Sequence, residues 1–184
     1  MKKHCCERKN MENIVEKTLQ ILEQNGLKIS VAESCTGGYL SYLLTSINGA
    51  SSVYKGGVTT YCIESKMKLL GVKASIFETF SVYSNECVEA MARGVAGLFN
   101  TQIAIATSGL ATDDTSSDNF LKLPAGLVFT CVLINEKAYF LSKNYLENLQ
   151  DHKIIEVNTR NLVQQQACLN SLDFLLQNLD SILK

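Results

Sequence analysis

Residues 31–38 read Val-Ala-Glu-Ser-Cys-Thr-Gly-Gly. They begin at the end of an apolar run, residues 27–32, and are followed by an amphipathic segment, residues 39–47. This pattern predicts a strand, a tight turn and a helix from Gly37 to Ile47 with Thr36 as its N-cap. Glycines allow a ligand to approach the backbone closely, and the first N–H groups of a helix have no partner within it. The turn is therefore a predicted anion or oxyanion site beside a serine and a cysteine. A well-capped helix start with no chemistry remains the alternative for this stretch alone.

Outward from this turn, segments of helical and strand periodicity alternate along the chain. They predict a single domain at residues 11–184, a three-layer α/β/α sandwich with a mixed sheet, preceded by a mobile tail at residues 1–10. Predicted helices span 11–24, 37–47, 63–70, 85–99 and 158–183, and predicted strands span 27–32, 56–62, 102–107, 127–134 and 137–143. The polar residues 111–122 form a loop whose length indicates either a function or disorder.

Composition excludes several classes of function. With 17 basic and 18 acidic side chains and a net charge of -1, the chain has no bulk attraction for nucleic acid or an anionic membrane. No apolar run approaches the roughly 18 residues of a membrane span. The seven cysteines follow no secreted disulfide framework and no signal peptide precedes them, so we expect reduced thiols in a cytoplasmic protein. The cluster His4-Cys5-Cys6 lacks a partner cluster apart from His152, so we expect no metal site.

Chemistry-bearing residues follow three predicted strands. Glu33 and Ser34 follow the first, Tyr61 and Lys66 the second, and the pair Ser108-Gly109 the third. Since ligands bind at the carboxyl ends of strands in such sheets, these residues are predicted to converge on one site.

The chain has only two histidines, and one of them lies in the predicted tail, so a Ser-His-Asp triad is not expected. A lysine is therefore the predicted base for Ser34. Lys66 can serve if burial lowers its pKa, with Tyr61 as a proton relay or hydroxyl partner. The alternatives are a solvated Lys66 paired with Glu64 or Asp114 and an ordinary strand-end aromatic at Tyr61. For Cys35 we expect a small buried thiol rather than a nucleophile.

The motif at residues 32–38 and several others resemble the CinA C-terminal domain family over residues 11–183, as in its stand-alone members. The other motifs are Gly56-Gly57-Val58, Tyr61 with Lys66, Leu69-Leu70-Gly71-Val72, Met91-Ala92-Arg93-Gly94 and Ser108-Gly109-Leu110-Ala111. The resemblance implies an amidohydrolase that converts nicotinamide mononucleotide to nicotinate mononucleotide and ammonia, in a pathway of pyridine nucleotide salvage. It also implies a three-layer fold, homo-oligomers and no metal or other cofactor.

The resemblance places the catalytic serine, tyrosine and lysine at Ser34, Tyr61 and Lys66. Candidate substrate-binding residues surround them, with backbone N–H groups near residues 36–38 for the oxyanion and Arg160 for the ribose phosphate. The full set is Glu33, Thr36, Gly37, Gly38, Ser108, Gly109 and Arg160.

Three departures from the family pattern leave alternatives open. Asp113 and Asp114 replace glycines suited to a phosphate, Ile63 replaces an asparagine, and Gln164 stands where the family has a second arginine after Arg160. A family member that binds a nucleotide or a protein partner without turnover is therefore one alternative. An amidase for a non-phosphorylated amide is the other.

Overall fold

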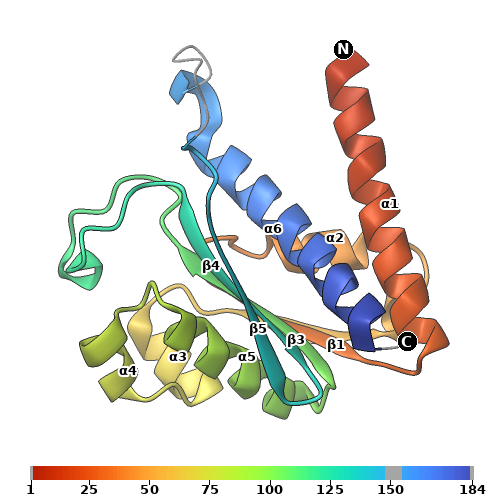
Figure 1. The fold of residues 1–184 in the computed structure, drawn as a ribbon, viewed down its shortest axis with the longest axis horizontal. Helices are drawn as coiled ribbons and strands as arrows, with labels where there is room; N and C mark the ends of the chain where they lie inside the picture. The colour runs from red at the N-terminus through yellow and green to blue at the C-terminus, as the bar shows by residue number, and fades with distance from the viewer. Residues whose placement is uncertain (1, 148–154, 183–184) are drawn as a thin grey trace.

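The computed structural model describes the backbone of residues 2–147 and 155–182 and the side chains of residues 11–147 and 159–182. Helices and strands alternate along the first two thirds of the chain, and a β-hairpin and a long helix follow (Figure 1). The elements are α1 (Lys2–Gln24), β1 (Ile29–Glu33), α2 (Tyr39–Thr45), η1 (Ala50–Ser52), β2 (Tyr54–Thr59), α3 (Ile63–Leu70), α4 (Ala74–Phe80), α5 (Asn85–Phe99), β3 (Ile103–Gly109), η2 (Ser117–Asn119), β4 (Leu127–Ile134), β5 (Lys137–Asn144) and α6 (Ile155–Ile182).

The five strands form one mixed sheet in the order β2-β1-β3-β4-β5. Strand β1 pairs in parallel with β2 and with β3, whereas β4 runs antiparallel to both β3 and β5. The predicted mixed sheet is thus confirmed. Its parallel part brings the carboxyl ends of β1, β2 and β3 to one edge.

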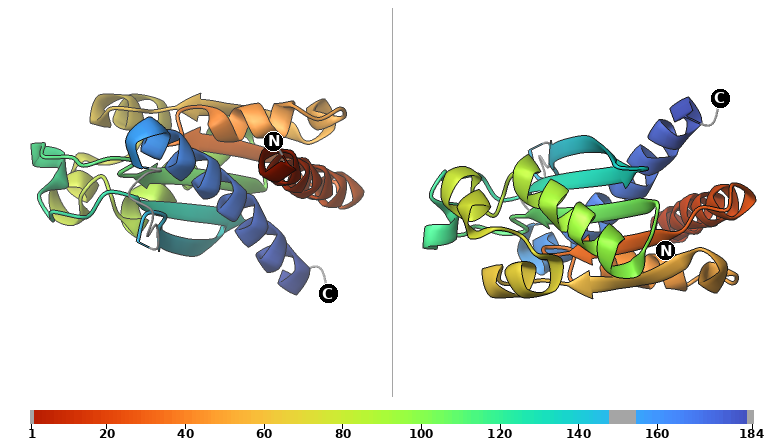
Figure 2. Two further views of the ribbon diagram at one scale, coloured as in Figure 1. Left: turned by 90° about the horizontal axis from the view of Figure 1, so that it is seen from above. Right: turned by 90° about the horizontal axis from the view of Figure 1, so that it is seen from below.

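Helices cover both faces of the sheet, which confirms the predicted three layers. Figure 2 shows α1, α2 and α6 on one face and α3, α4 and α5 on the other. Alternation along β3 supplies both cores, because Ile103 and Ile105 pack beneath α1 and α6, whereas Ala104 and Ala106 face α5. These small side chains allow α5 to lie close to the sheet.

Local signals explain the boundaries that the sequence predicts well. Helix α5 begins after Ser84, whose Oγ accepts a hydrogen bond from the N–H of Cys87 at 3.1 Å, as expected of an N-cap. The turn between β4 and β5 consists of Asn135 and Glu136, both with positive φ, which suits a two-residue hairpin. The predicted bounds of α3, α5 and β4 are confirmed.

Other boundaries differ from the prediction. Helix α1 begins at Lys2 rather than at residue 11, since the Lys, Glu and Arg side chains there are good helix formers. Mobility of residues 1–10 stays a prediction. Helix α4 is absent from the predicted elements because its seven residues are too few to show a clear period, and β2 lies earlier than predicted, at Tyr54–Thr59.

None of the described helices combines the length and the hydrophobicity needed to cross a bilayer. Among the residues whose side chains are described, Lys66 is the largest fully buried one. It lies on α3 at the edge where the parallel strands end.

Candidate active site

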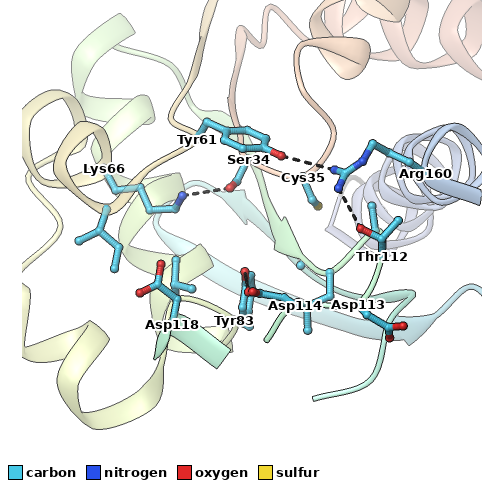
Figure 3. Close-up of a pocket in the computed structure, with 15 residues that line it drawn as sticks. Ser34, Cys35, Tyr61, Lys66, Tyr83, Thr112, Asp113, Asp114, Asp118 and Arg160 are labelled. Atoms are coloured by element: carbon cyan, nitrogen blue, oxygen red, sulfur yellow. Dashed lines mark hydrogen bonds between the residues drawn. The ribbon is translucent and has the colours of Figure 1, made fainter. Parts of the chain in front are cut away.

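A cavity of about 310 Å³ opens at the carboxyl ends of the parallel strands. Residues from the turn after β1, the loop after β2, helix α3, the loop before α5, the loop after β3 and helix α6 line it (Figure 3). They are Ser34, Cys35, Tyr61, Ile63, Lys66, Val82, Tyr83, Gly109, Leu110, Ala111, Thr112, Asp113, Asp114, Asp118 and Arg160. The convergence predicted from the three strand ends is found here for Ser34, Tyr61, Lys66 and Gly109.

Ser34 and Lys66 contact each other directly. Lys66 Nζ lies 3.0 Å from Ser34 Oγ and donates a second hydrogen bond of 2.6 Å to the carbonyl of Thr60. Lys66 is 0% exposed and Ser34 is 8% exposed, so bulk water does not compete for this contact. An alcohol and an amine at this distance are the parts of a serine nucleophile with a lysine base.

The surroundings of Lys66 favour its neutral amine. Burial lowers the pKa of Lys66 because the charged ammonium loses its hydration. Two nearby thiols, Cys35 and Cys87, are themselves buried, and burial raises the pKa of each to about 12. These thiols are uncharged at neutral pH, and the carboxylate of Asp118 raises the pKa of Lys66 less than burial lowers it. The alternative of a solvated Lys66 paired with Glu64 or Asp114 is wrong, since Lys66 is fully buried and its amine donates to Ser34 and to the carbonyl of Thr60.

Cys35 follows the serine and packs beneath the turn. Its side chain is buried against Ala111, Val128, Val163 and Ala167. The raised pKa keeps it a thiol, as the sequence predicts.

Glu33 takes the donors that the sequence assigns to a ligand. Its buried carboxylate accepts hydrogen bonds from the N–H groups of Gly38, Leu40 and Ser41, at 3.0, 3.0 and 2.8 Å, and from Ser41 Oγ at 2.6 Å. The anion at the start of α2 is thus a side chain of the protein. Glu33 does not line the cavity, and its contacts fix the strand–turn–helix unit that carries Ser34.

The turn itself also differs from the prediction. Thr36 is not an N-cap: its Oγ1 bonds to Thr107 Oγ1 at 2.8 Å, and α2 begins at Tyr39 after Gly38, whose φ of 98° suits glycine. The N–H of Gly37 donates to the carbonyl of Ser34. The predicted free donors at residues 36–38 are therefore wrong for Gly37 and Gly38. The N–H of Thr36 has no partner among the described residues, although none of the three residues lines the cavity.

Tyr61 lies at the mouth of the cavity rather than beside the nucleophile. Its side chain is 65% exposed, and its hydroxyl accepts a hydrogen bond of 3.4 Å from Arg160 Nη1. Arg160 Nη2 donates to Thr112 Oγ1 at 2.9 Å, so the guanidinium bridges two loops across the cavity (Figure 3). Neither Ser34 nor Lys66 bonds to Tyr61, so its predicted part in proton transfer stays a prediction.

The two residues at the end of β3, Ser108 and Gly109, take different positions relative to the cavity. Ser108 is fully buried, and its hydroxyl donates to the carbonyl of Val82 at 2.8 Å, which ties β3 to the loop before α5. Gly109 lines the cavity, and its backbone approaches Leu127 and Val128 so closely that a Cβ would lie 2.5 Å from the Leu127 carbonyl. Ser108 therefore supports the site from outside, and Gly109 forms part of its wall.

The polar loop after β3 contributes three carboxylates to the cavity, Asp113, Asp114 and Asp118. Asp114 accepts hydrogen bonds from Tyr83 Oη at 2.7 Å and from the N–H of Ser116 at 2.8 Å. These contacts hold the loop at the cavity wall, and a functional role for it stays a prediction.

Three of the polar residues that line the cavity were not named as site candidates from the sequence. Tyr83, Thr112 and Asp118 reach the cavity from segments without a recognisable motif. For Asp118 and Thr112 the position of their loop after a parallel strand was a usable signal. Tyr83 precedes the N-cap Ser84 and has no such signal, since only the tertiary fold brings it opposite β1.

Gln164 holds the turn from α6. Its Nε2 donates to the carbonyl of Cys35 at 2.9 Å. It stands where the family resemblance leads one to expect an arginine, and its amide contacts the protein backbone. The side chains of His4, Cys5, Cys6 and His152 lie outside the described residues.

Comparison with known proteins matches residues 11–179 to the CinA C-terminal domain. A CinA-like protein of Petrotoga mobilis is 40% identical over 131 residues, which are 71% of this chain and 32% of the relative. A CinA-like protein of Dictyoglomus turgidum is 31% identical over 168 residues, or 91% of this chain and 37% of the relative. The chain thus spans about a third of the length of these relatives.

Solved structures of similar fold cover nearly the whole chain. The competence damage-inducible protein A of Klebsiella pneumoniae superposes with a TM-score of 0.81 at 26% identity, covering 92% of this chain and 97% of that one. The competence/damage inducible protein of Agrobacterium tumefaciens gives 0.78 at 26% identity, covering 91% and 94%. The three-layer architecture is therefore shared with these proteins.

Proposed function

This chain belongs to the CinA C-terminal domain family, and on that premise we propose that it is an amidohydrolase converting nicotinamide mononucleotide to nicotinate mononucleotide and ammonia. One observation carries the proposal: the buried contact of 3.0 Å between Lys66 Nζ and Ser34 Oγ inside a cavity. The substrate comes from the resemblance, and the cavity volume of about 310 Å³ lies at the lower end of the range for small-molecule sites.

In the proposed mechanism the neutral amine of Lys66 takes the proton of Ser34 as Oγ attacks the carboxamide carbon. The resulting ammonium returns this proton to the amide nitrogen, and the C–N bond breaks to release ammonia. An ester on Ser34 remains. Lys66 then deprotonates a water molecule that attacks the ester, and the C–O bond breaks to free the carboxylate and restore the serine.

Other groups would orient the substrate. The turn after β1 offers no oxyanion donor from Gly37 or Gly38, since the Ser34 carbonyl and Glu33 occupy their N–H groups, and Thr36 lies outside the cavity lining. Arg160 is the cation at the mouth and is proposed to attract the ribose phosphate, beside the Ser108-Gly109 end of β3. Tyr61 would fix Arg160 through the contact between their side chains.

A second candidate is an amidase for a non-phosphorylated amide. The observation that favours it is the set of three carboxylates, Asp113, Asp114 and Asp118, which line the same cavity and would repel a phosphate. A third is a member that binds a nucleotide or a protein partner without turnover. We further propose that the protein is a cytoplasmic homo-oligomer of pyridine nucleotide salvage, as the resemblance implies.

Ammonia release from nicotinamide mononucleotide and from nicotinamide riboside, with thermal shifts for both, separates these functions. The proposed function predicts release from the mononucleotide with the higher kcat/KM. Release that favours the riboside replaces it with the second candidate. A thermal shift without ammonia from either compound replaces it with binding alone.

A further inference from the structure

Tyr83 and Asp114 form a wall of the cavity that the proposed mechanism does not use. Tyr83 comes from the loop between α4 and α5, and Asp114 comes from the loop after β3. In Figure 3 they lie across the open space from Ser34 and Lys66. The phenol Oη donates to Asp114 Oδ2 at 2.7 Å, so the two side chains act as one hydrogen-bonded unit.

This wall is held by contacts behind it. The N–H of Tyr83 donates to Ser81 Oγ at 3.2 Å, and Ser81 Oγ donates to the carbonyl of Asp118 at 3.0 Å. The buried side chain of Asn119 donates to the carbonyl of Asp114 at 3.0 Å. The aromatic ring and the carboxylate are therefore positioned before any ligand arrives.

The protonation of the pair is defined by its surroundings. Hydrogen bonds, first from the backbone N–H of Ser116 and then from Tyr83, lower the pKa of Asp114, so it carries a negative charge at neutral pH. Burial and then the contact with Asp114 raise the pKa of the Tyr83 phenol, which stays a donor. A π-face beside a fixed carboxylate is a setting that attracts a cation.

Charge is distributed unevenly around the cavity. The guanidinium of Arg160 lies on the side of Ser34, whereas the carboxylates of Asp114 and Asp118 lie on the side of Tyr83 (Figure 3). A substrate with an anionic group at one end and a cationic ring at the other matches this distribution. A carboxamide on a pyridinium ring would present its carbon to Ser34 while the ring faces Tyr83.

We propose that Tyr83 and Asp114 form the ring subsite of this cavity and select carboxamides whose pyridine nitrogen is positively charged by N-glycosylation. This inference rests on the proposed function and names the feature of its substrate that the subsite recognises, the positive charge of the N-glycosylated pyridinium ring. Amides with a neutral ring, including the dihydropyridine form of the same nucleotide, bind more weakly because they lack this charge. Tyr83 and Asp114 are thus specificity-determining residues.

The test measures binding in the Ser34→Ala variant, so that turnover does not interfere. Dissociation constants for nicotinamide mononucleotide and its 1,4-dihydropyridine form are obtained by calorimetry. We expect the charged form to bind about tenfold tighter. Adding Asp114→Asn, which keeps the size and a hydrogen-bond acceptor, should reduce this ratio to about twofold. Adding Asp173→Asn is the matched control, since Asp173 lies about 20 Å along α6 from Arg160 and should leave the ratio unchanged.

A second variant guards against a rearranged loop. Tyr83→Phe keeps the ring and removes only the hydrogen bond to Asp114, and we expect it to lower the ratio by about twofold with an unchanged thermal midpoint. Equal binding of the two forms by the Ser34→Ala protein overturns the inference. An unchanged ratio of the two dissociation constants after adding Asp114→Asn also overturns it. Failure to bind either form overturns it too.

The outcome is separable from that of the proposed function. Ammonia release without a charge preference in binding removes the ring subsite and keeps the amidase. A charge preference without ammonia release keeps the ring subsite and removes the amidase.

Discussion

The carboxylate of Glu33 is expected to be one of the largest single contributors to the stability of this domain. It is 0% exposed and accepts four hydrogen bonds, from the N–H groups of Gly38, Leu40 and Ser41 and from Ser41 Oγ. In Glu33→Gln one carboxylate oxygen becomes an NH₂ group that faces donors. Two hydrogen bonds of the ionic kind are lost, at about 1.5–3 kcal/mol each. We expect the free energy of unfolding to fall by about 3–6 kcal/mol.

Urea denaturation followed by circular dichroism measures this loss. The matched control is Glu89→Gln, which breaks the exposed ion pair with Arg93 at 2.6 Å and should cost less than about 1 kcal/mol. A loss below about 1 kcal/mol for Glu33→Gln would refute the reasoning, because the carboxylate would then not be the anchor of the turn.

Four further results are expected. Lys66→Arg should abolish ammonia release, since a guanidinium cannot give up its proton, whereas the parent's rate should rise with pH through the lowered pKa of Lys66. The pKa of Lys66 in the folded protein lies below its ordinary value of 10.5, so between these two pH values the unfolded chain binds more protons. The free energy of unfolding should therefore rise with pH in this range, and Lys66→Met should remove that rise. Arg160→Gln should raise KM for the mononucleotide about tenfold and leave that for the riboside within about twofold; equal effects on both would exclude a phosphate contact. Gly94→Ala places a methyl against the Leu70 backbone and should cost about 1–3 kcal/mol of unfolding free energy in the same urea denaturation. Gly97→Ala has nothing within 4 Å of the added methyl and should stabilise the protein slightly.

Local chemistry made much of the fold predictable. The N-cap Ser84 and an apolar stripe define α5, and the Asn135-Glu136 turn between two apolar runs defines the hairpin. Helix α4 was not predictable because a seven-residue segment shows too little periodicity. Its existence depends on Phe77 reaching the core between α5 and the sheet, which is a tertiary fact.

The site residues that directly follow parallel strands were predictable from the sequence. Those whose position depends on tertiary contacts were not. Ser34 and Lys66 could be paired because both follow parallel strands. The role of Glu33 could not be predicted, because the sequence shows a glutamate beside a serine but does not show that its carboxylate points toward α2. Tyr83 is 49 positions from Ser34 in a segment without a motif, so only the folded chain shows them facing one cavity.

The central claim is that Ser34 is a nucleophile activated by Lys66. Its most direct test compares ammonia release from nicotinamide mononucleotide by the parent, Ser34→Ala and Ser46→Ala, an exposed serine at the far end of α2. The account predicts that Ser34→Ala lowers the rate at least about 10³-fold with an unchanged thermal midpoint, while Ser46→Ala retains the parent's rate. Full activity in a folded Ser34→Ala protein would contradict the account.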